Sequence, residues 1–257
     1  MTINQQLIAL YTLVLRELVR MFRIATQVFL PPVITTLLYF VIFGSVIGHH
    51  IGQIQGFSYA EFIAPGLIMI AVISNAYANV ANSLFSARFQ RSIEEILVSP
   101  MHYSLMLLGY SLGGILRSLI VAVLVYIVAS FFLDIDFTHI PMTLLVVLLV
   151  STLFSLAGFT NGMLARTFDD VALLPTFIIT PMTYLGGVFY DIHMLPPFWQ
   201  KVSYLNPIFY MVSALREAMI GQQAMNMALA VGIICMMLIF LVILNLVILK
   251  KGIGLHD

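Results

Sequence analysis

The chain has 257 residues, of which 61% are hydrophobic and 9% are charged, and its mean hydropathy is +1.07. Lysine plus arginine and aspartate plus glutamate number 11 each, so the net charge of zero says nothing about binding partners. The single cysteine, Cys235, excludes an internal disulfide.

Long uncharged stretches separate the few charged residues. A helix needs about 20 apolar residues to cross the hydrocarbon core of a bilayer, and most of these stretches reach that length. Backbone in lipid must satisfy its own hydrogen bonds, and runs this long form helices rather than barrel strands. We therefore expect a single-domain (1–257), all-α polytopic membrane protein with six spans, at residues 24–48, 62–87, 106–133, 140–165, 171–190 and 226–249.

Residues 1–23 precede the first predicted span and have an amphipathic pattern. Polar and charged side chains, among them Arg16, Arg20 and Arg23, alternate with apolar ones at helical spacing. The pattern predicts a helix that lies in the cytoplasmic membrane surface. The alternative, a simple extension of the first span, stays open at this stage. The apolar positions are Ile3, Leu7, Leu10, Tyr11, Val14, Leu18 and Phe22.

The positive charges indicate the orientation. All lysines and arginines except Lys201 and Arg216 fall on one side of the predicted spans. Because cytoplasmic loops carry an excess of positive charge, we expect both termini of this multi-pass membrane protein to be cytoplasmic.

Two predicted spans carry a polar but uncharged face. In the second span, Asn75, Asn79 and Asn82 follow helical spacing, and such side chains either bond to neighbouring helices or line a substrate path. The sequence leaves these two alternatives open. The fifth span has a similar face, for which packing is the simpler interpretation because threonine hydroxyls can bond to their own helix. Its residues are Thr176, Thr180 and Thr183.

Residues 92–100 lie between the second and third spans and predict a short cytoplasmic helix. Ser92 and Glu95 have the spacing of a capping box, and Pro100 would end the helix. The two carboxylates lie beside apolar side chains, a combination that favours a protein partner over a merely solvated turn. The residues concerned are Ser92, Glu94, Glu95, Ile96, Leu97 and Pro100.

Residues 191–217 form the second irregular stretch, between the fifth and sixth spans. The apolar pieces are too short to cross a membrane, and aromatic residues typical of an interface are abundant. We expect two short helices that dip into the outer leaflet and return, with Arg216 and Glu217 paired at membrane depth.

The sequence lacks the common motifs for nucleotide binding, zinc binding and nucleophilic catalysis. The sequence has no G-x-x-x-x-G-K-[ST] phosphate loop, no H-E-x-x-H zinc motif and no G-x-S-x-G nucleophile elbow. Glu94 and Glu95 have no histidine or arginine beside them that would form a catalytic set. We therefore predict no catalytic residues, no metal site and no cofactor in this chain.

Several segments together resemble the ABC-2 type transporter permeases. They are Gly186-Gly187-Val188-Phe189-Tyr190, Leu195-Pro196, Leu205-Asn206-Pro207-Ile208-Phe209-Tyr210 and Ala214-Leu215-Arg216. The amphipathic start, the six spans and the Glu94-Glu95 helix occur in matching order, so the resemblance covers essentially the whole chain.

The resemblance implies a specific function. The protein would be the permease subunit of a bacterial inner-membrane exporter, a homodimer that pairs with a separate ATPase subunit, which binds the ATP and Mg²⁺. Residues 92–100 would be the coupling helix that docks on the ATPase, and residues 191–217 the external re-entrant helices. An ion-coupled secondary transporter and an intramembrane enzyme remain as alternatives. The apolar spans favour an amphiphilic or lipid-linked cargo without identifying it.

Overall fold

The computed structural model describes residues 3–99, 101–133, 138–222 and 225–254, and nearly all of its regular structure is helical. Five helical segments in these ranges are long and apolar enough to cross a membrane. They are Ala25–Gly44, formed by α2 (Ala25–Tyr39) and the start of the π-helical η1 (Phe40–Ile47), together with α4 (Tyr59–Phe89), α6 (Tyr103–Ser130), α7 (Ile140–Leu164) and α12 (Met227–Lys251).

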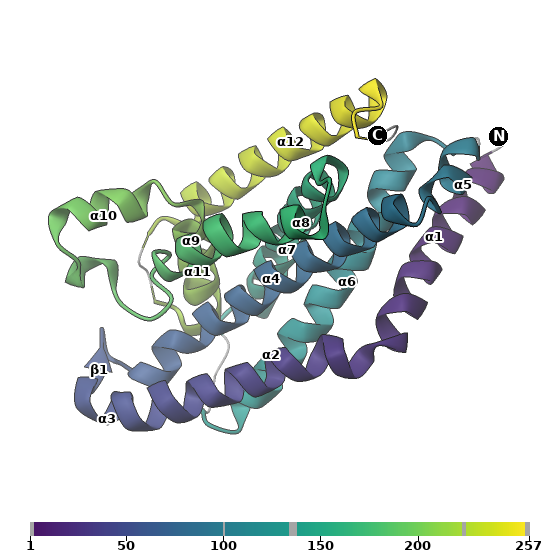
Figure 1. The fold of residues 1–257 in the computed structure, drawn as a ribbon. Helices are drawn as coiled ribbons and strands as arrows, with labels where there is room; N and C mark the ends of the chain where they lie inside the picture. Colours follow the sequence, from purple (N-terminus) through teal and green to yellow (C-terminus); the bar gives the residue numbers. More distant parts are fainter. Residues whose placement is uncertain (1–2, 100, 134–137, 223–224, 255–257) are drawn as a thin grey trace.

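Helix α4 is the centre of the bundle and is buried along most of its length. It begins at a capping box, in which the Glu61 carboxylate accepts from the Ser58 N–H at 2.8 Å and the Ser58 hydroxyl accepts from the Glu61 N–H at 3.3 Å. Helices α6 and α7 pack on α4, α2 packs on α6, and α12 packs on α7 (Figure 1).

Close approach of α4 and α7 depends on small residues of α7. A Cβ at Gly158 would lie 2.4 Å from the Tyr77 carbonyl oxygen, and one at Gly162 would lie 3.0 Å from that of Ala81. The small-xxx-small spacing on α7 therefore serves packing inside one chain. Gly109 and Gly113 of α6 do the same against α1 (Ile3–Arg23), where they face Leu13 and Glu17.

Arg88, in the last turn of α4, ties α4 to the end of α7. Its Nη1 donates to the carbonyl oxygens of Gly162, Met163 and Ala165 at 2.7–2.9 Å. These carbonyls belong to the C-terminal turn of α7, where a helix has no partners of its own for them and carries partial negative charge. The Arg88 guanidinium therefore supplies hydrogen-bond donors to the unpaired carbonyls and positive charge to the negative end of the helix dipole.

The predicted fifth span, 171–190, is not among the long apolar helices. The chain there forms α8 (Phe168–Leu174), the π-helical η2 (Pro175–Ile179) and α9 (Thr180–Tyr184), and the helical run ends at Tyr184. Pro175 and Pro181 each remove a backbone donor, and Gly187 then adopts a φ of +72° that ends any helical continuation. Six spans are therefore not confirmed.

Helix α8 begins at a second capping box, between Thr167 and Asp170. The N–H groups of Arg166 and Thr167 both donate to the Asp170 carboxylate at 2.9 Å. These bonds favour the charged form and hold the pKa of Asp170 below its usual range.

Helix α1 runs beside α6 instead of lying apart from the bundle (Figure 1). Its Leu13, Glu17 and Met21 are buried, while Ile3, Leu7 and Tyr11 are exposed. A helix thus covers residues 3–23, and its inner face packs along the side of α6 and reaches Asn79 in the middle of α4; its position in the membrane surface stays a prediction.

The two ends of the bundle differ. The start of α1, the end of α12 and α5 (Ile93–Val98) lie at one end (Figure 1). The other end carries α3 (Gly48–Ile51), the antiparallel pair β1 (Gln53–Ile54) and β2 (Phe57–Ser58), η3 (Ile192–Met194) and α10 (Pro197–Tyr204). Helix α11 (Pro207–Ile220) packs inward from that end against α4, α7 and α12.

Candidate functional site around helices α1, α4 and α5

Helix α5 is anchored on one side and exposed on the other. Ile93 is buried in a cluster with Leu84 and Met106, whereas Glu94 and Glu95 are exposed and Val98 is 85% exposed. Ile96 is half-buried; the Leu97 side chain and Pro100 lie outside the described part of the structure. The arrangement presents two carboxylates and an apolar residue on a short helix held to the bundle.

The capping box predicted for Ser92 and Glu95 is wrong. Arg91 takes a left-handed conformation, with φ of +59°, and turns the chain back at the end of α4. Ser92 is therefore already helical, and its hydroxyl donates to the Ala87 carbonyl at 3.3 Å instead of accepting from the first turn of α5. An N-cap residue needs an extended backbone to aim its oxygen at the helix start, which Ser92 does not have.

The predicted asparagine face of α4 divides in two. Asn75 accepts from Nε of Arg117 at 3.1 Å, and Asn79 accepts from Nη2 of Arg20 at 3.0 Å, so both bond to arginines of neighbouring helices. Asn82 is exposed and donates to the Ala78 carbonyl of its own helix at 2.8 Å. A role in lining a path stays a prediction.

The threonines predicted to share a face bond within their own segment. The Thr180 hydroxyl donates to the Pro175 carbonyl at 2.8 Å, and the Thr183 hydroxyl donates to the Thr180 carbonyl at 2.6 Å. Thr176 and Thr180 are exposed, and Thr183 is buried.

Glu17 is the site residue that the sequence analysis missed. It is 2% exposed, and its carboxylate accepts from the Ser83 hydroxyl at 2.8 Å and from Nη2 of Arg20 at 2.8 Å, with Arg16 at 3.6 Å. A signal was available, because Glu17 is the only acidic residue before residue 61 and has helical spacing to Leu13 and Met21 on the buried face.

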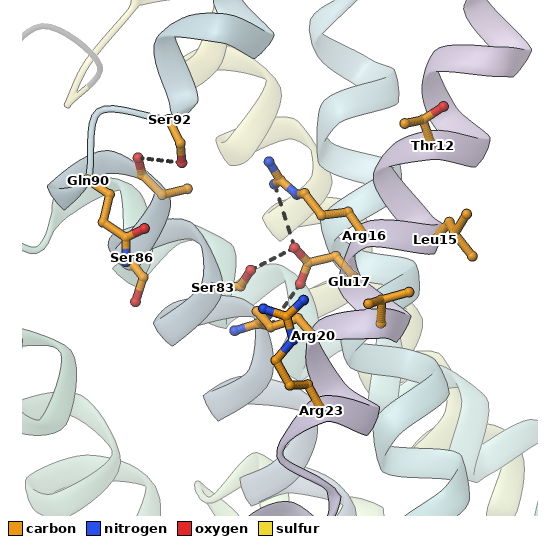
Figure 2. A pocket seen from close by; sticks show the side chains of 12 residues that line it. Thr12, Leu15, Arg16, Glu17, Arg20, Arg23, Ser83, Ser86, Gln90 and Ser92 are labelled. Atoms are coloured by element: carbon orange, nitrogen blue, oxygen red, sulfur yellow. Dashed lines mark hydrogen bonds and ion pairs between the residues drawn. The ribbon is translucent and has the colours of Figure 1, made fainter.

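Glu17 and its arginine partners form one wall of a pocket of about 490 Å³ between α1 and the last turns of α4 (Figure 2). Arg16, Glu17, Arg20 and Arg23 reach it from α1. The opposite wall carries hydroxyl and amide groups, from Ser83, Ser86, Gln90 and Ser92. Three cations and one carboxylate therefore lie opposite these hydroxyl and amide groups, in a pocket that also has apolar lining residues.

At the opposite end of the bundle, Arg216 holds three segments together. It is 3% exposed, its Nε donates to the Phe62 carbonyl at 3.2 Å, and its Nη2 donates to the Gly187 carbonyl at 2.8 Å. The guanidinium also lies 3.9 Å from the centre of the Phe62 ring, within cation–π range.

The predicted Arg216–Glu217 pair is wrong. Both residues lie on α11, and successive residues on a helix point in directions about 100° apart, so they cannot face each other. Arg216 points into the bundle and takes backbone carbonyls as partners, whereas Glu217 is half-buried.

The predicted Gly-Gly and Asn-Pro motifs shape two turns, one at Gly187 beside this arginine and one at the start of α11. Gly187 has a positive φ, and Gly186 lies against Ile208. Asn206 caps α11 by accepting from the Ile208 N–H at 3.0 Å and also donates to the Met182 carbonyl at 2.6 Å. Pro207 occupies the first turn, where a missing N–H costs least.

Comparison with known families decides the assignment. The profile of the ABC-2 type transporter family matches residues 8–220, from α1 to the end of α11. The chain belongs to the ABC-2 type transporter family.

Relatives agree with this assignment over about three quarters of the chain or more. The inner membrane transport permease YadH of Escherichia coli K12 is 46% identical over 250 residues, which cover 97% of this chain and 98% of YadH. Nodulation protein J of Rhizobium leguminosarum bv. viciae is 25% identical over 213 residues, 81% of each chain. Nodulation protein J of Rhizobium meliloti is 22% identical over 200 residues, 77% of this chain and 76% of that protein.

As an ABC-2 permease, the protein is the membrane component of an ABC transporter and not a catalytic enzyme. It is a multi-pass inner membrane protein. Among the described residues, no group of three or more histidine, cysteine or carboxylate side chains could hold a metal ion.

Proposed function

We propose that two copies of this permease form the translocation path of an exporter, and that a separate ATPase subunit, which binds ATP and Mg²⁺, drives them through α5. The observation that carries the proposal is the exposed, acidic α5, which lies at the same end of the bundle as the start of α1 and the end of α12. The lysines and arginines concentrated at that end support its assignment to the cytoplasm.

Contacts at α5 can be transmitted to α4. Ile93 packs into the apolar cluster that includes Leu84 and Met106, so a force on Glu94 and Glu95 acts on the end of α4 rather than on a free loop. Further along α4, Phe62 is bonded to Arg216, and Gly66 packs against the backbone of Val188. Displacement of α4 would therefore move the segment that follows α9.

Exposed polar residues support a path formed between two copies. Asn82, Thr176 and Thr180 are exposed in one protomer, although they belong to predicted spans. A polar side chain that faces lipid is costly, and a second copy or a hydrated path would relieve that cost. Apolar spans around such a path favour an amphiphilic or lipid-linked cargo.

Reversing both acidic charges of α5 tests the coupling. With Glu94→Lys and Glu95→Lys, we expect co-purification of the ATPase subunit and transport-coupled ATP hydrolysis to fall about tenfold or more. The reason is that the surface of the ATPase subunit that is proposed to bind the two carboxylates would meet cationic side chains instead. Both side chains are exposed, so the fold should not change, and the thermal unfolding temperature in detergent checks this.

The matched control is Lys201→Glu, an exposed charge reversal on α10 at the opposite end, which should leave the ATPase bound. Normal ATPase binding and normal transport in the α5 double variant would refute the proposal. Transport driven by a proton gradient without any ATPase would favour an ion-coupled secondary transporter instead.

A further inference from the structure

The pocket between α1 and α4 has an excess of positive charge. Glu17 is the acid in both ion pairs formed by described residues, with Arg20 at 2.8 Å and Arg16 at 3.6 Å. Arg23 also lines the pocket, and no described carboxylate pairs with it. One carboxylate thus faces three guanidinium groups, and this surplus of positive charge favours an anion as the ligand of the pocket.

Arg117 is a further cation near the pocket, and its partner on α4 lies one helical turn from the partner of Arg20. It lies in the middle of α6 and donates to Asn75, while Arg20 donates to Asn79, so the two arginines occupy successive turns of the same α4 face. The described residues provide no carboxylate partner for Arg117 either.

Two buried donors beside the pocket also lack an acceptor. Nε of Arg20 and Nδ2 of Asn79 are buried and make no hydrogen bond in the described structure, and Asn79 as a whole is 2% exposed. Leaving such a group unsatisfied costs about 1–3 kcal/mol, and buried donors normally have partners. Arg20 lines the pocket, so an acceptor that enters between α1 and α4 would supply what its Nε lacks, whereas Nδ2 of Asn79 lies beside Gly113 of α6.

The pocket has the composition that an anionic head group needs. Figure 2 shows Arg16 and Arg20 on the α1 wall with their guanidinium groups near Glu17, and Ser83 facing them from α4. Hydroxyl and amide donors complete the opposite wall, and the exposed Leu15 and Val19 form an apolar rim on α1. The volume of about 490 Å³ exceeds that of a water molecule many times.

We propose that this pocket binds the phosphate group of an anionic amphiphile, with the phosphate between Arg16, Arg20 and Arg23 and the acyl or prenyl chain along Leu15 and Val19. Guanidinium groups bind phosphate oxygens through paired, charge-assisted hydrogen bonds, and an apolar rim selects a head group that carries a chain. The phosphate belongs either to a membrane phospholipid or to a lipid-linked cargo; the second source rests on the proposed function.

Replacing Glu17 should strengthen anion binding, whereas the loss of a purely structural residue would weaken it. Its carboxylate occupies Arg20 and lies near Arg16, so it competes with an incoming phosphate for the same cations. Replacing it with glutamine keeps an acceptor for Ser83 but removes the competing charge. Binding of the anion should therefore become tighter in Glu17→Gln.

The test measures binding of two probes to the purified full-length chain by native mass spectrometry in a non-ionic detergent. The probes are phosphatidylglycerol and a polyprenyl phosphate, with phosphatidylcholine as the zwitterionic reference. We expect Arg16→Gln/Arg23→Gln to bind both anionic probes about tenfold more weakly, and Glu17→Gln to bind them severalfold more tightly. The control Arg166→Gln removes an exposed arginine that does not line the pocket and should bind like the wild type.

Each outcome is informative. Equal binding of both anionic probes assigns the site to membrane phospholipid, and displacement of phosphatidylglycerol by about tenfold less polyprenyl phosphate assigns it to a lipid-linked cargo. Unchanged binding in the double arginine variant, or weaker binding in Glu17→Gln, would overturn the proposal. Arg23→Gln alone removes no hydrogen bond or ion pair formed among the described residues, so a binding loss in this variant, with an unchanged thermal unfolding temperature, would report on the pocket. The Glu94→Lys/Glu95→Lys variant should bind the probes normally, so the two proposals fail separately.

Discussion

Alanine at Gly158 should strongly destabilise the folded form of this ABC-2 permease. The new Cβ would lie 2.4 Å from the Tyr77 carbonyl oxygen, far inside van der Waals contact, and that neighbour is backbone of the most buried helix of the bundle. No side chain can rotate away, so α4 and α7 must separate. Overpacking a tight core costs about 1–3 kcal/mol and sometimes more, and we expect the upper part of that range. Thermal unfolding in detergent and the yield of monodisperse protein measure the effect.

Gly232→Ala is the matched control. Gly232 lies on the long apolar helix α12, and a Cβ there has no neighbour within 4 Å. Alanine is a better helix former than glycine by up to about 1 kcal/mol, so this variant should be unchanged or slightly more stable. Wild-type stability of Gly158→Ala would show that α4 and α7 do not pack as closely as described.

Removing the Arg216 guanidinium should have an effect of similar size. Arg216→Ala leaves the carbonyls of Phe62 and Gly187 without their donor in a site that is 3% exposed, and it also removes the cation over the Phe62 ring. We expect a loss of about 3–5 kcal/mol, the range found when one partner of a buried charged interaction is deleted. Thermal unfolding and protease sensitivity of residues 186–206 provide the measurements.

Arg216→Lys distinguishes charge from geometry. A lysine has one nitrogen at its end and cannot bond to Phe62 and Gly187 while stacking on a ring, so it should recover only part of the loss. Lys201→Ala, at an exposed position of the same end, should change stability by less than about 0.5 kcal/mol. An Arg216→Ala variant as stable as Lys201→Ala would contradict the bracing role.

Hydrophobic length predicts the long helices of this protein well. The runs at 62–87, 140–165 and 226–249 correspond to α4, α7 and α12 within a few residues, because an apolar stretch of that length has few alternatives to a helix. The run at 171–190 is also uncharged, yet its helix contains a π-helical segment and ends at Tyr184. Composition cannot resolve where Pro175, Pro181 and Gly187 interrupt such a run.

The side-chain partners were less predictable. The sequence indicates that Asn75 and Asn79 are polar residues in a span, but their arginine partners come from α1 and α6, elements distant in sequence. The misassigned capping box at Ser92 depends on the backbone of Arg91, which local sequence does not specify. Arg216 was predicted to pair with an acid at membrane depth. It donates instead to the backbone carbonyls of Phe62 and Gly187, and no sequence pattern indicates such partners.

The bonds of Arg88 limit how the bundle can deform. Three carbonyls at the end of α7 depend on one side chain of α4, and further along, Gly158 interlocks with Tyr77, so sliding α4 past α7 would break contacts at two separate levels. The two helices are thus expected to swing as one rigid unit. Bending must then be absorbed where helical hydrogen bonding is already irregular, in the π-helical segments η1 and η2, which would serve as the hinges of the protomer.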